Sequence, residues 1–280
     1  KADWLAEHIR SEEWLTNTAG FGWFNGYYDE DARRVEGDHP DGVRMTLTGQ
    51  VFPLMGGVAS DDQVEQVVRA VDHYLYAEGV GGVRLNTDFG PNPPRLGRMF
   101  GFAFGHKENG AMFSHMAVMY ACALYRRGQV AAGWRILDGI YRQSQDFARS
   151  RIYPGIPEYF DPRGRGMYPY LTGSAAWYLY TLLTEAYGVR GGLGDLVLAP
   201  KLTRAQFAGA DRLSVRTVFA GKTLDVDYVN PLGLEYGAYA IAALTVDGKP
   251  VPVEAGAGQV SLSRKEVKAW PLHARLGVQL

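Results

Sequence analysis

One change of side-chain spacing, near residue 195, constrains the fold of this 280-residue chain more than any other feature. Before it, apolar residues recur at the spacing of an amphipathic helix, as in residues 64–75. After it, apolar and polar residues alternate, as in residues 213–219 and 224–229, which is typical of β-strands. One segment cannot place its apolar side chains on one face both as a helix and as a strand, because the two structures need different spacings. We therefore expect two domains, a mainly α-helical one over residues 1–195 and a small antiparallel β-sandwich over residues 196–280.

The spacing of the predicted helices indicates how the first domain is arranged. Its helical segments are separated by alternately short and long loops, and residues 85–90 belong to a long loop that could line a cleft. Such a rhythm is typical of a toroid of helical hairpins whose long loops gather at one mouth. In the second domain, the turns Ala220-Gly221-Lys222 and Asp247-Gly248 predict β-hairpins. No strand alternation precedes residue 195, which argues against an α/β fold.

The overall composition excludes several classes of function. With a net charge of −1 and an isoelectric point near 6.7, the chain has no broad electrostatic field for nucleic acid or an anionic membrane. The sequence has no apolar run long enough to span a bilayer and no signal-peptide core. Its one cysteine, Cys122, excludes an intrachain disulfide and favours a buried inert thiol. We therefore expect a cytoplasmic protein without nucleic-acid or membrane partners.

Two loops carry the residues best suited to chemistry. Residues 101–115 and 164–177 are both rich in glycine, polar and aromatic residues, and each runs into an apolar helical pattern. Loops at helix entrances are where a helical scaffold usually holds its functional groups. We interpret the two loops as the anion-binding and sugar-binding floor of a carbohydrate-active enzyme.

The second loop ends in Thr172-Gly173-Ser174 at a predicted helix start. Exposed N–H groups and the helix dipole make a helix start of this kind suitable for phosphate. The alternative is that Thr172 or Ser174 is an ordinary N-cap, whose side chain satisfies the helix and binds no ligand. The sequence leaves both interpretations open.

The first loop combines a cation, a carboxylate and an imidazole at Lys107, Glu108 and His115. Phosphate and sugar hydroxyls need such donors and acceptors. The alternative is a solvated turn followed by a packed histidine. Neither His106 nor His115 has the spacing of a metal ligand to a second ligand, so we expect no metal site and no cofactor.

Glycosidic chemistry also needs carboxylates, and the loops contain several candidates. Their pairing cannot be read from sequence, because retaining and inverting enzymes differ in the spatial separation of their two carboxyl groups. We expect most of them to be surface residues or ligands of sugar hydroxyls. The candidates are Asp29, Asp31, Glu36, Asp88, Glu108, Glu158 and Asp161.

The same loops carry a family resemblance that covers nearly the whole chain. The motifs are Lys107-Glu108-Asn109-Gly110, Phe113-Ser114-His115 and the run from Leu171 to Trp177. With them, the sequence resembles the cellobiose and cellodextrin phosphorylase family, glycoside hydrolase family 94. The cellodextrin phosphorylase branch, which uses long β-glucan oligosaccharides, looks nearest, and laminari- or 1,2-linked oligoglucans remain open as substrates. The resemblance implies the C-terminal part of an (α/α)6 barrel followed by a β-sandwich, and commonly a homodimer.

The resemblance also implies a reaction and a set of site residues. Inorganic phosphate, a co-substrate, attacks the anomeric carbon of a β-linked gluco-oligosaccharide with inversion, while one carboxylic acid protonates the leaving oxygen. The products are α-glucose 1-phosphate and a shortened chain. By motif, the phosphate-binding positions are His115, Thr172 and Gly173. The sugar-binding positions are Lys107, Glu108, Gln50 and Glu158.

One departure from the family concerns the proton donor. The family's acid is an aspartate in an Asp-Trp-Asn-Asp-like motif, upstream of the segment that matches residues 1–28, and this motif is absent here. The family's N-terminal β-domain, first barrel helices and phosphate-binding arginine are absent as well. We therefore expect no general acid in this chain. It would be a C-terminal portion, inactive alone, that needs the missing N-terminal portion of the enzyme.

Three other functions remain open from the sequence. The first is a hydrolase on the same scaffold, with water in the place of phosphate. The second is a non-catalytic carbohydrate-binding fragment, and the third is the glucan-processing module of a cyclic glucan synthase with a membrane-linked parent. The sequence does not select the linkage or the chain length of the glucan.

Overall fold

The computed structural model describes residues 1–90, 96–153, 155–170 and 172–280, and these form two compact units, Lys1–Leu179 and Tyr180–Leu280. The division falls earlier in the chain than the change of spacing at residue 195. The reason is that strand β10 (Val189–Gly192) pairs with β11 (Asp195–Leu198), so the segment between the last long helix and residue 195 belongs to the C-terminal unit. Within the described residues, none of the helices combines the length and the apolarity that crossing a bilayer requires.

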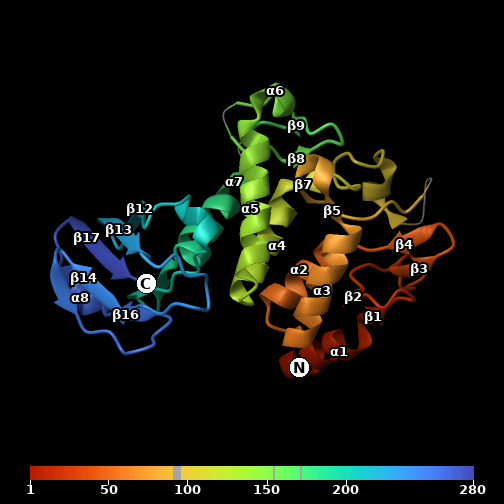
Figure 1. Ribbon diagram of the computed structural model, residues 1–280. Coiled ribbons are helices and arrows are strands. Elements are labelled where there is room, and N and C mark those ends of the chain that lie inside the picture. Colours follow the sequence, from red (N-terminus) through yellow and green to blue (C-terminus); the bar gives the residue numbers. More distant parts are fainter. Residues whose placement is uncertain (91–95, 154, 171) are drawn as a thin grey trace. The chain divides into compact units, whose positions relative to one another are not determined.

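Helix α4 packs against both α2 and α5 in the N-terminal unit (Figure 1). Helix α4 is buried along most of its length, and Gly128 has a φ of +75° at the short turn that leads into α5. A β-carbon on Gly133 would lie 2.8 Å from the Tyr125 ring, so a glycine is needed where these two helices touch. The helices are α1 (Ala2–Glu12), α2 (Thr48–Met55), α3 (Asp61–Tyr74), α4 (Ser114–Arg126), α5 (Val130–Gln145), α6 (Phe147–Ser150) and α7 (Gly173–Thr181), whose last two residues belong to the C-terminal unit.

Short strands connect these helices, so the fold is mixed helix and sheet and the prediction of a mainly α fold was too simple. Sequence spacing misses such strands because two or three residues are too few to show an alternation. The strands are β1 (Trp14–Thr16) with β2 (Gly22–Phe24), β3 (Gly37–His39) with β4 (Gly42–Arg44), β5 (Tyr76–Ala77) with β6 (Gly82–Val83), and β7 (Met112–Phe113) with β8 (Tyr159–Phe160) and β9 (Gly166–Met167).

The predicted hairpin of helices is present in α4 and α5, which run from residue 114 to residue 145 with three residues between them. The short 3-10 segments η1 (Glu78–Val80) and η3 (Arg98–Gly101) lie in the long loops. The described part of the unit does not establish a closed ring of helices. The (α/α)6 barrel therefore stays a prediction.

The C-terminal unit consists of two sheets that share one hydrophobic core. Buried and half-buried side chains alternate along β13, as predicted. Leu224, Val226 and Tyr228 point into the core, and the residues between them are half-buried. The three-stranded sheet has the order β10–β11–β16, and the five-stranded sheet has the order β12–β13–β17–β14–β15. The remaining elements are η4 (Leu182–Ala186), η5 (Arg204–Phe207), β12 (Arg212–Phe219), β13 (Lys222–Val229), β14 (Ala243–Val246), β15 (Lys249–Val251), β16 (Val260–Leu262), α8 (Arg264–Ala269) and β17 (His273–Gln279).

The sandwich is not wholly antiparallel, which corrects the prediction. Strands β13 and β17 are parallel neighbours, with Leu224 opposite Ala274. A tight hairpin forces consecutive strands to be antiparallel, but β17 returns to this sheet after the chain has passed through β16 and α8. Both predicted hairpin turns are confirmed: Ala220-Gly221 and Asp247-Gly248 have positive φ at both positions, as a type I′ turn requires.

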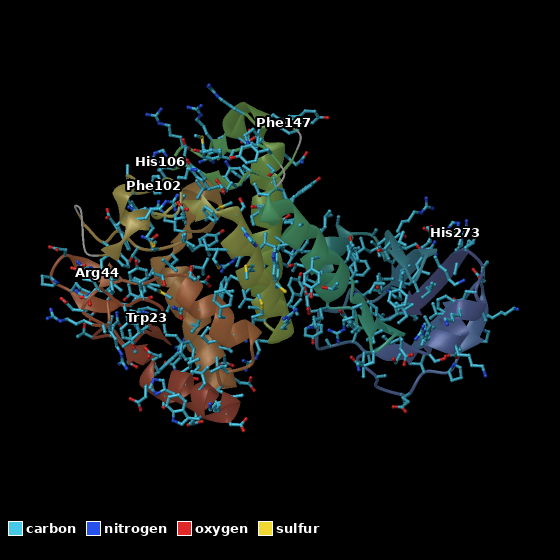
Figure 2. The ribbon with its side chains drawn as sticks, turned by 180° about the vertical axis from the view of Figure 1, so that it is seen from behind. Trp23, Arg44, Phe102, His106, Phe147 and His273 are labelled. Carbon is cyan, nitrogen blue, oxygen red and sulfur yellow. The ribbon has the colours of Figure 1, made fainter. Side chains whose placement is uncertain are left out.

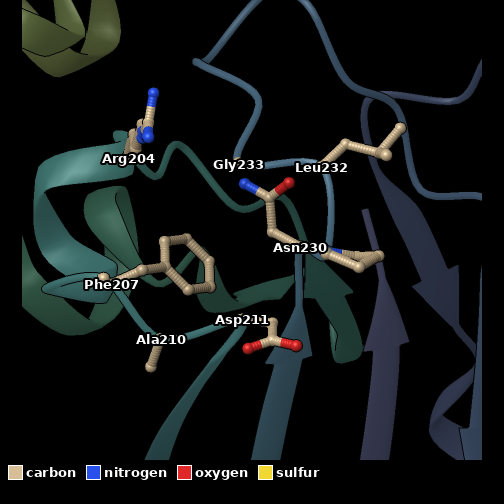
Figure 3. Close-up of a pocket in the computed structure, with 9 residues that line it drawn as sticks. Arg204, Phe207, Ala210, Asp211, Asn230, Leu232 and Gly233 are labelled. Carbon is tan, nitrogen blue, oxygen red and sulfur yellow. The ribbon is translucent and has the colours of Figure 1, made fainter.

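A cavity of about 200 Å³ lies in the C-terminal unit, where the loop after β13 meets the segment from η5 to β12 (Figure 3). Arg204, Phe207, Asp211 and Asn230 are among its lining residues. The Asn230 side chain closes the loop by donating to the Leu234 carbonyl at 2.9 Å and accepting from the Leu234 N–H at 3.0 Å. None of the residues predicted to bind phosphate or sugar lines this cavity.

A buried carboxylate organises the start of the N-terminal unit. Glu36 is 5% exposed and accepts four hydrogen bonds, from Trp23 Nε1, Gly26 N and both the N–H and the hydroxyl of Thr46, at 2.7 to 3.1 Å. Trp23, labelled in Figure 2, is fully buried in β2. Burial raises the pKa of the Glu36 carboxyl to about 7, because the loss of solvation outweighs these hydrogen bonds.

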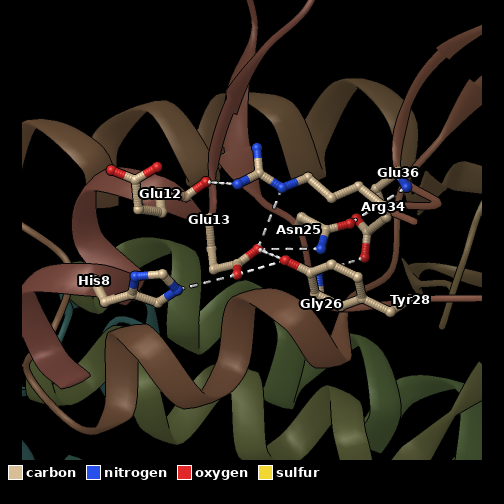
Figure 4. A network of polar contacts seen from close by, with 8 residues as sticks. All are labelled: His8, Glu12, Glu13, Asn25, Gly26, Tyr28, Arg34 and Glu36. Carbon is tan, nitrogen blue, oxygen red and sulfur yellow. Dashed lines mark hydrogen bonds and ion pairs between the residues drawn. The ribbon is translucent and has the colours of Figure 1, made fainter. Parts of the chain in front are cut away.

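A second carboxylate, Glu13, joins the end of α1 to the same loops (Figure 4). It accepts hydrogen bonds from the Tyr28 hydroxyl at 2.6 Å and from Asn25 Nδ2 at 3.2 Å, and Arg34 Nε lies 3.7 Å away. The backbone N–H of Asn25 also donates to the backbone carbonyl of Glu13 at 2.7 Å. Two carboxylates, one buried and one partly buried, thus fix the loop between β2 and β3.

The raised pKa of Glu36 predicts a pH dependence of stability. The folded state binds this proton more tightly than the unfolded chain, so we expect the free energy of unfolding to fall by up to about 3 kcal/mol as pH rises from 4.5 through 7. In Glu36→Gln this slope should disappear, and the variant should be less stable than the parent at pH 5, because an amide N–H₂ would face N–H donors. Urea denaturation at several pH values measures both effects. Glu65→Gln, at an exposed position of α3, is the control, and a slope that persists in Glu36→Gln would refute the prediction.

Candidate phosphate and sugar site

The two predicted loops meet at the first turns of α4 and α7. His115 is the second residue of α4 and Gly173 is the first residue of α7. A β-carbon on Gly173 would lie 2.6 Å from Cε1 and 2.8 Å from Nδ1 of His115, so the imidazole rests directly against the glycine backbone. The ring also lies 6.1 Å from the Trp177 ring, one turn further along α7. Any larger residue at position 173 would displace the imidazole.

Thr172, next to Gly173, caps the start of α7. Its hydroxyl oxygen accepts a hydrogen bond from the Ser174 N–H at 3.2 Å, which is the N-cap geometry that the sequence left open. One cap satisfies only one of the N–H groups that a helix start leaves without an intrahelical partner. The cap and an anion site at the same helix start are therefore compatible. The structure brings together all three residues predicted to bind phosphate.

Several polar atoms around this contact lack a hydrogen-bond partner among the described residues. They are the hydroxyls of Ser114 and Ser174, both fully buried, and Nε2 of His115. Helix α4 also has no side-chain cap, since Phe113 precedes it. Buried polar atoms normally pair, and an exception calls for a water, an ion or a ligand. Two hydroxyls and an imidazole at two helix starts form a site that can receive an anion through hydrogen bonds.

The pKa of the His115 imidazole is sensitive to its surroundings, including a bound anion. Burial lowers the pKa of the imidazole, because the charged form loses its solvation. The ring is therefore mostly neutral at pH 7 in the free chain. A nearby anion would favour the imidazolium and raise its pKa again.

The predicted sugar-binding residues Lys107 and Glu158 lie next to each other. Lys107 Nζ is 4.0 Å from Glu158 Oε2 and 3.7 Å from the centre of the Tyr168 ring. The sheet of β7, β8 and β9 connects this group to the helix that carries His115, because the Ser114 N–H donates to the Glu158 carbonyl at 2.9 Å. Tyr168 was not among the predicted sugar-binding residues, because its position in the loop gave no signal beyond its aromatic character.

Glu108, the next predicted sugar ligand, is held by one oxygen only. Its Oε1 is 3.0 Å from Arg98 Nη1, and its Oε2 is buried without a partner among the described residues. The Arg98 guanidinium also lies over the Phe102 ring, 5.2 Å from its centre. The unpaired oxygen is an acceptor that a sugar hydroxyl can use.

A cavity of about 460 Å³ lies beside this loop. Asp88 and Gly90 line it, as predicted for residues 85–90, together with Phe100, Phe102 and Asn109. Asn109 is fixed by donating to the Phe102 carbonyl at 2.7 Å and by accepting from Asn86 Nδ2 at 3.1 Å. Aromatic rings with a carboxylate and an amide are a surface suited to saccharides.

Gln50, the fourth predicted sugar ligand, is hydrogen-bonded inside the N-terminal unit. Its side chain is completely buried, accepts from Phe24 N at 2.9 Å, and donates to the carbonyls of Phe24 and Thr46 at 2.8 and 2.9 Å. These three bonds use both of its N–H groups and its carbonyl oxygen. Gln50 therefore ties α2 to β2, and its role in sugar binding stays a prediction.

The chain also matches a known protein family. The model of the glycosyl hydrolase 94 superfamily, catalytic domain, matches residues 1–188. The chain belongs to this superfamily.

Curated relatives share low identity over most of the chain. It is similar to the 3-O-β-D-glucopyranosyl-β-D-glucuronide phosphorylase of Paenibacillus borealis (23% identity over 84% of this chain and 31% of that protein). It is also similar to the N,N′-diacetylchitobiose phosphorylase of Vibrio proteolyticus (23%, 82% and 29%) and to the cellobionic acid phosphorylase of Neurospora crassa (24%, 79% and 28%). The chain thus spans about three tenths of the length of these relatives, whose names give three different substrates.

Among solved structures, the GH63 mannosylglycerate hydrolase of Thermus thermophilus matches 64% of this chain and 37% of its own chain, at 17% identity and a TM-score of 0.39. This likeness is too low to support a conclusion. Among the residues that the structure describes, no three His, Cys, Asp or Glu side chains are placed to hold a metal ion together.

The buried setting of His115 predicts a response to phosphate. We expect the pKa of the His115 imidazole to lie below its usual value in the free chain and to rise when phosphate is added, because the anion stabilises the imidazolium. Following the ring resonances by NMR during pH titrations with and without phosphate measures this pKa. His8, exposed on α1, is the internal reference, and an equal response of both rings would contradict the prediction.

Proposed function

We propose that this chain is the phosphate-binding and sugar-binding part of an inverting glycoside phosphorylase. The observation that supports this most is the contact of His115 with Gly173, beside the buried unpaired hydroxyls of Ser114 and Ser174. A hydrolase that uses water has no need of so many donors at one point. Phosphate has several oxygens that can accept all of them.

The reaction follows from these groups. A phosphate oxygen attacks the anomeric carbon, the bond to the glycosidic oxygen breaks, and a carboxylic acid gives its proton to that leaving oxygen. The hydroxyls, the His115 ring and the N–H groups of α7 hold the phosphate in line and offset its repulsion from nearby carboxylates. We propose that the acid is supplied from sequence upstream of Lys1, as the missing Asp-Trp-Asn-Asp-like motif suggests.

The sugar would bind beside the phosphate. In this proposal, Lys107 donates to sugar hydroxyls, while Glu158 and the free oxygen of Glu108 accept from them. The proposed substrate is a β-linked gluco-oligosaccharide of the cellodextrin type, and the products are α-glucose 1-phosphate and a chain shortened by one glucose. Laminari- or 1,2-linked oligoglucans are the alternative. We also propose that the chain forms part of an (α/α)6 barrel. The enzyme would be a homodimer located in the cytoplasm.

The close contact between Gly173 and the His115 ring allows a first test of the proposed phosphate site. We expect Gly173→Ala to weaken phosphate binding at least tenfold, because the new methyl group would displace the His115 ring. Calorimetric titration of the chain with inorganic phosphate measures the affinity. Gly79→Ala is the matched control, since nothing lies within 4 Å of a β-carbon there. Equal affinities of the two variants would refute the assignment of this phosphate site.

The second test concerns the reaction. Incubated with cellotetraose and phosphate, the chain alone should release no α-glucose 1-phosphate, and adding the upstream portion of the enzyme should restore the release. Enzymatic detection of glucose 1-phosphate measures the turnover. Release of free glucose that does not depend on phosphate would show a hydrolase instead. Rapid turnover by the chain alone would refute the upstream acid.

A further inference from the structure

Two residues near the sugar site share an unusual backbone conformation. Lys107 and Tyr168 have φ angles of +51° and +59°, in the left-handed region that residues with a β-carbon rarely adopt. Such strain persists only where surrounding contacts impose it, and it gathers at functional sites. These two strained residues, from loops about sixty positions apart, contact each other.

The contact joins the Lys107 ammonium to the face of the Tyr168 ring, at 3.7 Å from the ring centre. This is well inside the distance at which a cation and an aromatic face attract each other. Contact with Tyr168 is also the largest influence that raises the pKa of Lys107, ahead of the neighbouring carboxylates. The pair therefore favours a charged lysine.

The Tyr168 ring is itself held in place. Its ring lies 6.0 Å from the ring of Tyr159 in β8 and 5.7 Å from that of Tyr170. The Tyr168 carbonyl accepts a hydrogen bond from the Glu158 N–H at 3.3 Å. Tyr168 is thus anchored by both its ring and its backbone next to β8 and β9, and it gives Lys107 a rigid surface.

We infer that Tyr168 is a positioning residue that holds the Lys107 ammonium at the sugar-binding position. This inference rests on the proposed role of Lys107 in sugar binding. A lysine side chain has four rotatable bonds, and Glu158 alone, at 4.0 Å, is a weak restraint. The face of the Tyr168 ring, together with a side-chain hydrogen bond to Tyr168, restrains the ammonium. An ammonium carries three N–H donors, so further donors stay available for sugar hydroxyls.

A double-mutant cycle on cellotriose affinity tests the inference. We expect Tyr168→Leu to weaken binding by about tenfold and Tyr168→Phe, which keeps the ring face, to bind nearly as well as the parent. In a Lys107→Met background, Tyr168→Leu should cause no further loss, because the group that it positions is gone. Tyr141→Leu, at an exposed site on α5, is the matched control for aromatic loss. A merely structural role of Tyr168 would weaken binding equally in both backgrounds, and this result would overturn the inference.

A second readout separates the inference from the proposed function. The ε-CH₂ protons of Lys107 should show an upfield NMR shift from the ring of Tyr168, which Tyr168→Phe retains and Tyr168→Leu abolishes. A Lys107 resonance without this shift would overturn the inference and leave the proposed function standing. If instead Lys107→Met leaves cellotriose affinity unchanged, the proposed sugar role of Lys107 is wrong, even with the ring shift intact.

Discussion

The close approach of the His115 ring to the Gly173 backbone is the contact on which the candidate site depends. It requires a residue without a β-carbon at the first position of α7, and it requires α4 to begin at the same point. Where the two helix starts meet, the hydroxyls of Ser114 and Ser174 remain without partners among the described residues. The site is thus defined by what the helices leave unsatisfied, which a bound anion would satisfy.

Two buried polar residues hold the loops at the start of the N-terminal unit. Glu36 gathers N–H and O–H donors from Trp23, Gly26 and Thr46, and Gln50 bonds to the backbone on both sides of that loop. Among the described residues, no cation pairs with the Glu36 carboxyl, so hydrogen bonds stabilise it, as they do the neutral Gln50 amide. The raised pKa of Glu36 reflects the remaining cost of burying its charge. Gln50 illustrates that a residue matched to a family motif can also hold the fold together.

Much of the fold and part of the site could be predicted from local patterns. The alternation in β12 and β13 and the hairpin turns at residues 220–221 and 247–248 depend on neighbouring residues. The short strands of the N-terminal unit and the parallel pairing of β13 with β17 could not be predicted. Both arise from chain segments that meet only after folding, and no local period records them.

The sequence by itself determined the family and the two loops that carry the candidate phosphate-binding and sugar-binding residues, because those signals are fixed residue types at fixed spacings. Only the tertiary structure decided which of these residues meet. It placed His115 against Gly173, set the Lys107 ammonium on the face of the Tyr168 ring and buried the Gln50 side chain. The physical reason is that close packing between distant segments sets each side chain's distance, burial and pKa, and none of these is encoded in the spacing along the chain.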